Sequence, residues 1–302
     1  MNFYQQVDSN RHKTWLLISL SASLLILVGF VFSQVNNNPI WLYIALAYAV
    51  ISSFISYWWS DKIVLTISRA KEVQASDSPQ LYRLIENLCI TAGLPMPKIY
   101  VIDDSAPNAF ATGRDSKHAA VAFTSGLLAK LDKAELEGVI AHELSHIGNR
   151  DILLATIVSV LVGTVVLLAD WFARWSFWGG GRRRQDDQGA GQLQAILSIV
   201  AIILAILAPL FAQIIQMAIS RRREFLADAN SALLTRYPEG LIRALQKISA
   251  DPEPLEAANR ATAHLYFASP FHNKRGVSGL TKMFMSHPPV EERIAALRQI
   301  NI

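Results

Sequence analysis

The chain has 302 residues, 52% of them hydrophobic, and its mean hydropathy is +0.27. This composition is too apolar for an ordinary soluble enzyme and predicts membrane-spanning segments. The single cysteine, Cys89, excludes an intramolecular disulfide framework and fits a reducing compartment. The formal net charge of +4 is explained by lysines and arginines flanking membrane spans, so we expect no nucleic-acid partner.

Four apolar stretches have the length of membrane spans. Thr14–Ser33 and Ile40–Trp59 are joined by a short polar connection, and Ile152–Trp171 and Ala195–Ser220 by a Gly/Arg-rich one. We therefore predict two membrane hairpins with the lipid bilayer as a partner. Every lysine and arginine lies outside these stretches, and their distribution predicts that the N-terminus and both polar regions face the cytoplasm. Three arginines at 182–184 would lie on the opposite side of the membrane from the other positive charges, so the depth of the second hairpin in the bilayer stays open.

The polar regions carry the pattern of a soluble domain. An amphipathic helix is predicted over Ser78–Leu94, where Gly93 and Pro95 end it. Short strands are predicted over Lys98–Ile102 and Ala119–Phe123, and from Ser125 the chain turns helical. Further helices are predicted near the C-terminus, over Glu239–Ala250, Pro254–His264 and Val290–Ile300.

The helix predicted after Asp132 carries the motif H-E-x-x-H, beginning at His142. Asp132 is a suitable N-cap, and Glu135 completes a capping box. Residues four apart share one face of a helix, so the imidazoles of His142 and His146 can bind one Zn²⁺ ion. Glu143 is then placed to activate a water molecule rather than to bind the metal. A coincidental pair of histidines is the simpler alternative.

A catalytic zinc ion usually takes three protein ligands and keeps one position for water. Glu224, at the start of the helix that follows the fourth apolar stretch, is the best candidate for the third ligand. Asp228 lies four residues later on the same face, where it can accept the second N–H of a histidine ligand. The alternative is that Glu224 is an ordinary surface carboxylate beside the three arginines at 221–223.

Together these motifs resemble the HtpX family of bacterial membrane zinc metallopeptidases, which is related to the CaaX prenyl protease. The resemblance extends over nearly the whole chain. It rests on the segments 108–113, 141–149, 223–228 and 286–289, which read NAFATG, AHELSHIGN, REFLAD and SHPP. It implies one zinc ion per chain, with Glu143 as the general base and Asp228 supporting a ligand. The implied ligands are His142, His146 and Glu224.

The resemblance implies a mainly α fold of the α+β type. Four transmembrane or membrane-associated helices would form two hairpins, over residues 1–60 and 152–220. A helical, zincin-type catalytic domain with a small β-sheet would be formed by residues 61–151 and 221–302. Because the ligands stand on both sides of the second hairpin, the chain must leave and re-enter the same membrane face. The family places such a multi-pass protein in the bacterial inner membrane, with the catalytic domain in the cytoplasm.

Substrate-binding residues follow from the resemblance as well. The residues Asn108, Ala109, Phe110 and Ala111 look like an edge strand beside the substrate groove, where an extended peptide can pair with the backbone. Asn108 could equally be a turn residue. His287, held by two following prolines, is the candidate for stabilising the oxyanion, although a lone loop histidine could be structural.

Three more residues are candidate supports. Arg293 could assist His287 or simply pair with an acidic residue, and we favour the second interpretation. Asn149 and Asp151 could brace the metal-binding helix, although Asp151 could also be an interfacial charge.

The sequence therefore predicts a membrane-embedded zinc endopeptidase in which Glu143 moves a proton from water to the leaving amine. The resemblance suggests unfolded or damaged membrane proteins as substrates, in membrane protein quality control under stress, with self-cleavage as a further activity. CaaX-type processing is an alternative, but four spans offer little material for the large chamber it requires. A non-catalytic membrane adaptor or holdase is an alternative of a different class.

Overall fold

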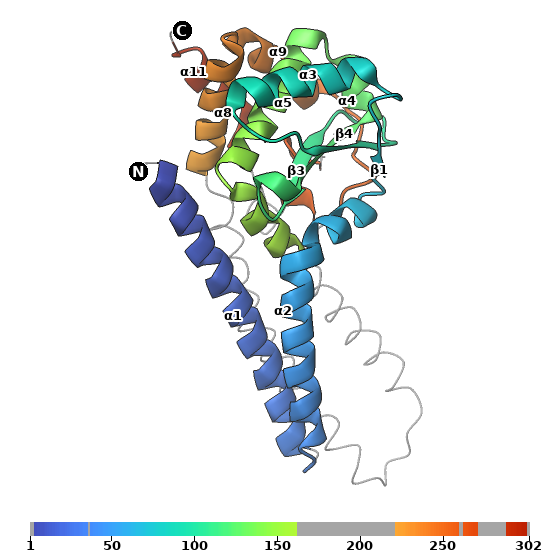
Figure 1. The fold of residues 1–302 in the computed structure, drawn as a ribbon, viewed down its shortest axis with the longest axis vertical. Coiled ribbons are helices and arrows are strands. Elements are labelled where there is room, and N and C mark those ends of the chain that lie inside the picture. The colour runs from blue at the N-terminus through green and yellow to red at the C-terminus, as the bar shows by residue number, and fades with distance from the viewer. Residues whose placement is uncertain (1–2, 36, 162–220, 260–261, 271–287, 301–302) are drawn as a thin grey trace.

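The computed structural model describes residues 3–35, 37–161, 221–259, 262–270 and 288–300. Two long helices, α1 (Phe3–Val35) and α2 (Ile40–Ile67), extend side by side from a head of shorter helices and a small sheet (Figure 1). Both contain segments that are long and apolar enough to cross a membrane, His12–Gln34 and Ile40–Ile67. The start of α1 and the end of α2 both lie at the head, and the turn between them lies at the far end, so the two helices form a hairpin.

The two long helices approach closely where small residues meet. A Cβ atom at Gly29 would lie 2.1 Å from the Cβ atom of Ala45, so any side chain there would force the helices apart. Small residues of this kind allow close packing in lipid, where apolar side chains gain nothing by leaving the hydrocarbon. At the turn, the side-chain oxygen of Asn38 accepts the N–H of Ile40 at 3.0 Å and satisfies one of the free N–H groups that begin α2.

The start of the second predicted hairpin lies within the described part of the chain. Asp151–Leu161 forms a shorter apolar helix that packs against α1. The rest of Ile152–Trp171 and all of Ala195–Ser220 lie outside the described residues, so four membrane helices stay a prediction. The contact between α1 and this helix buries Leu17, Ile18, Leu154, Ile157, Val158 and Leu161.

The head contains a four-stranded mixed sheet in the order β1-β2-β4-β3. β1 (Lys71–Glu72) runs antiparallel to β2 (Lys98–Ile102), which runs parallel to β4 (Ala119–Thr124). β3 (Ala109–Gly113) runs antiparallel to β4 and forms one edge. Both predicted strands are confirmed. β1 was not predicted, because two residues are too few to carry a periodic pattern.

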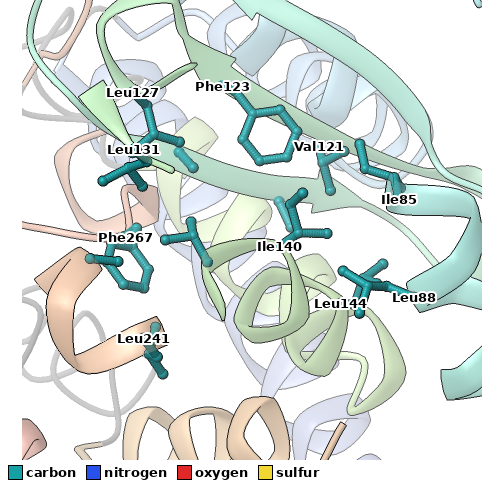
Figure 2. Packing of buried hydrophobic residues seen from close by; sticks show 14 of the residues in the cluster. Ile85, Leu88, Val121, Phe123, Leu127, Leu131, Ile140, Leu144, Leu241 and Phe267 are labelled. Atoms are coloured by element: carbon teal, nitrogen blue, oxygen red, sulfur yellow. The ribbon is translucent and has the colours of Figure 1, made fainter. Parts of the chain in front are cut away.

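The main core lies between this sheet and the helices of the head (Figure 2). Val121 and Phe123 of β4 share one buried cluster with Ile140 and Leu144 of one helix and Leu241 of another, and each of these side chains is at most 1% exposed. Burying one such side chain contributes about 1.5–3 kcal/mol. The helices of the head are α3 (Pro79–Ala92), α4 (Ser125–Lys130), α5 (Lys133–Gly148), α8 (Arg221–Thr235), α9 (Pro238–Ala250) and α11 (Val290–Leu297).

α5 is fixed near its middle by two neighbouring helices. A Cβ atom at Gly138 would lie 2.8 Å from the backbone nitrogen of Leu241 in α9, so glycine is required for this approach. From α8, the hydroxyl of Ser231 donates to the carbonyl of Gly138 at 2.7 Å. These contacts stand one turn before His142 and therefore position the metal motif.

The helix predicted over Pro254–His264 is wrong. The described residues there form turns and the short 3₁₀ helix η2 (Ala263–Leu265). The N–H of Ala257 donates to the carboxylate of Asp104 at 3.0 Å, although 153 residues separate them. Because this N–H is bonded to a distant part of the head, it is not available for helical pairing.

Candidate metal centre

α5 begins with the predicted capping box. The Asp132 carboxylate accepts the N–H of Glu135 at 2.9 Å, and the Glu135 carboxylate accepts the N–H of Asp132 at 2.8 Å. Glu135 is 1% exposed and also receives the ammonium group of Lys247 at 2.7 Å. An N-cap contributes about 1 kcal/mol to the stability of a helix. The start of α5 is therefore held firmly ahead of the metal motif.

Three side chains from two helices converge near the end of α5. The Nε2 atoms of His142 and His146 are 3.2 Å apart. Glu224, on α8, places one carboxylate oxygen 3.7 Å from the first Nε2 atom and the other 3.5 Å from the second. Tetrahedral ligand atoms about 2.0–2.1 Å from one Zn²⁺ ion stand about 3.3 Å apart. The three side chains therefore fit one zinc ion, and their ligand atoms lie within 4.8 Å of one another.

The second nitrogen of each imidazole is held by a carboxylate. His142 Nδ1 lies 2.9 Å from Asp228, and His146 Nδ1 lies 3.2 Å from Asp151. A carboxylate can only accept a hydrogen bond, so each contact places the proton on Nδ1 and leaves the Nε2 lone pair for a metal ion. Asp228 thus occupies the position expected from its spacing, and Asp151 contacts a candidate ligand directly.

Arg293 pairs with Asp228 inside the protein. Its Nη2 and Nε atoms donate to the two carboxylate oxygens at 2.6 and 2.8 Å, and its Nη1 atom donates to the carbonyl of Phe267 at 3.2 Å. The guanidinium carbon also lies 4.8 Å from the centre of the Phe267 ring. Arg293 is 1% exposed. Its Nη2 atom also lies 3.4 Å from His142 Nδ1, so Arg293 forms a buried ion pair that supports Asp228 beside a candidate ligand.

The buried charges shift the pKa values of the two groups that bond to each other. Burial opposes protonation of His142, but hydrogen bonds to Asp228 and Glu224 outweigh it and raise the pKa of His142 to about 9. Burial likewise opposes ionisation of Asp228, but Arg293 and His142 hold the pKa of this carboxyl below its usual value. A metal ion and a proton therefore compete for His142, while Asp228 stays charged.

A cavity of about 50 Å³ opens beside the three converging side chains. Glu143 is 2% exposed and lines this cavity together with Ala111 and Phe267. The volume is sufficient for a few water molecules. Glu143 therefore shares a water-sized space with the candidate ligands, as a general base acting on water requires.

Asn149 is the C-cap of α5. Its side-chain amide donates to the hydroxyl of Ser145 at 3.2 Å, and Asn230 of α8 donates to the same hydroxyl at 2.8 Å. These bonds connect the end of the metal helix to the helix that carries Glu224. The supporting role predicted for Asn149 stays a prediction.

The predicted substrate strand corresponds to β3 and the residue before it. The side chain of Asn108 is buried and bonds to both backbone groups of Ala268, donating to the carbonyl at 3.0 Å and accepting the N–H at 3.1 Å. The N–H of Phe267 donates to the carbonyl of Ala109 at 2.7 Å. A substrate could therefore pair with Asn108 and Ala109 only by displacing this segment of the chain.

The next two residues of β3 stand in different surroundings. The ring of Phe110 is fully buried, with its centre 5.1 Å from that of Tyr266. Ala111 lines the cavity beside the candidate ligands. Substrate pairing along β3 stays a prediction, as does the role of His287, which lies outside the described residues.

Asn10 reaches the metal centre from the membrane hairpin. Its side-chain amide donates to one oxygen of Asp151 at 2.6 Å, while the other oxygen holds His146. Arg223 donates to the first oxygen at 3.3 Å. Sequence analysis did not find Asn10, because 141 residues separate it from Asp151 and no spacing rule connects the two.

Replacing Asn10 by alanine should weaken zinc binding by about tenfold, since losing an outer hydrogen-bond partner costs roughly 10- to 100-fold in metal affinity. Competition against a chelator of known affinity measures this change in the full-length protein. Asn38→Ala, at the opposite end of the same hairpin, is the matched control and should bind zinc like wild type. Unchanged zinc affinity in Asn10→Ala would show that the hydrogen bond from Asn10 to Asp151 does not contribute to metal binding.

The comparisons with known proteins agree with this geometry. A family model described as peptidase family M48 matches residues 75–301, which include α5 and α8. A protease HtpX homolog from Dictyoglomus thermophilum is 44% identical over 299 residues, covering 99% of this chain and 95% of the relative. One from Lactobacillus helveticus is 42% identical over 301 residues, covering 98% and 99%. One from Thermococcus sibiricus is 44% identical over 292 residues, covering 95% of each.

A solved structure gives a more distant match. The crystal structure of Ste24p from S. mikatae aligns with a TM-score of 0.50 at 21% identity, covering 97% of this chain and 67% of that one. At this level of identity the match supports a shared fold alone.

Proposed function

This chain belongs to peptidase family M48 and is an HtpX-like membrane metallopeptidase, and from that premise we propose that it is a zinc endopeptidase with its catalytic part in the cytoplasm. One observation carries the proposal. His142, His146 and Glu224 converge with the spacing of zinc ligands, and Glu143 lines the cavity beside them.

The three converging side chains would hold the zinc ion, and Asp228 and Asp151 would keep both imidazoles turned towards it. When bound, Zn²⁺ polarises a peptide carbonyl group and lowers the pKa of a water molecule. Glu143 accepts a proton from a water molecule as the water oxygen adds to the peptide carbonyl carbon, and it returns the proton to the amine nitrogen as the C–N bond breaks. His287 completes the proposal as the side chain that stabilises the oxyanion.

Unfolded or damaged membrane proteins are the proposed substrates, and self-cleavage is a proposed second activity. The short distance between the site and the hairpin supports this assignment, because Asp151 contacts His146 and also begins the apolar helix packed on α1. Unfolded segments offer the extended backbone that pairing with a strand requires. The cytoplasmic orientation rests on the excess of lysine and arginine in the polar regions, and the inner-membrane location rests on the similarity to the HtpX homologs.

The test is hydrolysis of casein by full-length protein in detergent, prepared under chelator and then supplied with zinc. Cleavage that appears only with zinc is the expected result. Tight zinc binding without cleavage would contradict a broad endopeptidase and favour a narrow, CaaX-type substrate or a membrane adaptor. Cleavage that persists under chelator would contradict a metallopeptidase mechanism in this preparation.

Replacing Glu224 by alanine should raise the Kd for zinc by more than roughly 100-fold, because a direct ligand is removed. Losing a residue that only supports a ligand costs at most about that much. Chelator competition again gives the Kd. Glu239→Ala is the matched control, since Glu239 is an exposed glutamate in the first turn of α9. If Glu224→Ala bound zinc as tightly as Glu239→Ala, the third ligand would have to be another group.

A further inference from the structure

A second and larger cavity, of about 610 Å³, lies where α2 meets the head. Phe54, Trp58 and Trp59 line it from α2, and residues of β2, β4 and the turn after β3 line it from the head. Its volume is in the range of small-molecule sites, about 300–1,000 Å³. None of the described residues that line it also lines the cavity at the metal centre, so the two are separate.

The position along α2 places this cavity at the membrane surface. The apolar stretch of α2 ends at Trp59, so the aromatic residues before it stand where a span reaches the lipid headgroups. These rings are open to the surroundings, with Phe54 55% and Trp59 42% exposed. Phe54 and Trp59 also contact each other, with ring centres 5.7 Å apart. An apolar wall therefore faces outward at headgroup level.

The other lining residues give the cavity a positive charge. Lys62, Lys98, Arg114 and Lys117 line it, and Asp61 is the one carboxylate among the described lining residues. This excess of cations beside a desolvating aromatic wall favours an anionic ligand.

Two of the four cations already pair with a carboxylate and two are available. Lys98 pairs with Glu72 at 3.2 Å and is therefore not counted towards the ligand. The guanidinium carbon of Arg114 lies 4.5 Å from the centre of the Trp58 ring, and Arg114 pairs with Asp115 at 3.5 Å. Within the described part of the chain, Lys62 and Lys117 make no ion pair, and both are exposed. A ligand would therefore find one cation fixed by aromatic stacking and two that can move onto it.

We propose that this cavity binds the headgroup of an anionic phospholipid. The phosphate diester accepts hydrogen bonds from Arg114, Lys62 and Lys117, and the glycerol and acyl chains continue along the exposed aromatic residues of α2 into the bilayer. A free phosphate ion would use the cations but not this apolar wall. An acidic peptide would use the cations but would leave the exposed aromatic residues of α2 uncovered. The site does not depend on the proposed peptidase activity.

The test uses full-length protein in mild detergent with an equimolar mixture of phosphatidylglycerol and phosphatidylcholine, and native mass spectrometry counts the bound lipids. Wild type should retain phosphatidylglycerol preferentially. The double variant Lys62→Gln/Lys117→Gln should lose about fivefold in phosphatidylglycerol affinity for each cation removed, with phosphatidylcholine unchanged. If the double variant does not fold, Lys117→Gln alone should lose about fivefold in phosphatidylglycerol affinity. Lys117 lies on the short 3₁₀ turn Ser116–His118.

Arg222→Gln is the matched control, because Arg222 is an exposed arginine of α8 that does not line the cavity. It should keep the full preference for phosphatidylglycerol. An equal loss in Arg222→Gln, or no preference in wild type, would overturn the proposal. Displacement of phosphatidylglycerol by millimolar inorganic phosphate, or by a short acidic peptide, would identify a different ligand class and overturn it as well.

Discussion

Replacing Glu143 by glutamine should reduce zinc-dependent hydrolysis of casein by about 10²- to 10⁴-fold, the usual contribution of a positioned general base. Glutamine has nearly the same shape as glutamate but cannot accept a proton from water. Because Glu143 lines the cavity and is not one of the three converging ligands, the Kd for zinc should stay unchanged. Initial rates and chelator competition on the same preparation separate these two effects.

The matched control is Glu137→Gln. Glu137 lies on the same helix, pairs with Lys133 at 3.8 Å and does not line the cavity. It should hydrolyse casein at the wild-type rate. A Glu143→Gln protein that stayed active would remove Glu143 as the base, and one that lost zinc would show that Glu143 holds the metal site together.

Replacing Arg293 by methionine should destabilise the head by about 3–5 kcal/mol, because the Asp228 carboxylate would remain buried without its partner. Arg293 and Asp228 are 1% exposed each and share two hydrogen bonds of 2.6 and 2.8 Å. The expected fall in Tm is on the order of 10 °C. Thermal unfolding in detergent under chelator measures this effect without a contribution from metal binding.

Arg298→Met is the matched control, since Arg298 is the exposed C-cap of the same helix, α11. Its Tm should stay close to that of wild type. The double variant Asp228→Asn/Arg293→Met removes both charges, so it should recover part of the loss caused by Arg293→Met. Equal unfolding temperatures for Arg293→Met and Arg298→Met would contradict a buried ion pair that supports the site.

Features with local causes could be predicted from the sequence. The capping box of Asp132 and Glu135 follows from a spacing of three residues, and it is present. The helix predicted over Ser78–Leu94 forms over Pro79–Ala92, ending where Gly93 adopts a left-handed conformation with φ of 64°. The contact between Asp228 and His142 follows from the i, i+4 geometry of α8 once Glu224 is placed near the metal motif.

Features that depend on distant contacts could not be predicted. The segment after Pro254 has helix-compatible residues, but a hydrogen bond from Ala257 to Asp104 holds its backbone in another conformation. Asp151 allowed two interpretations in the sequence, and the contact with His146 at 3.2 Å favours the supporting one. Asn10 carried no signal, since its partner is reached only after the hairpin folds against the head.

The hydrogen bond from Asn10 to Asp151 has a consequence for fragments of the protein. A protein that had lost α1 by cleavage would lack the amide that holds Asp151, and Asp151 orients His146. The apolar helix Asp151–Leu161 would also expose the face that α1 covers. Such a fragment would bind its metal more weakly and expose an apolar surface, while α2 would still anchor it. The metal centre is therefore complete only while α1 is packed against the head.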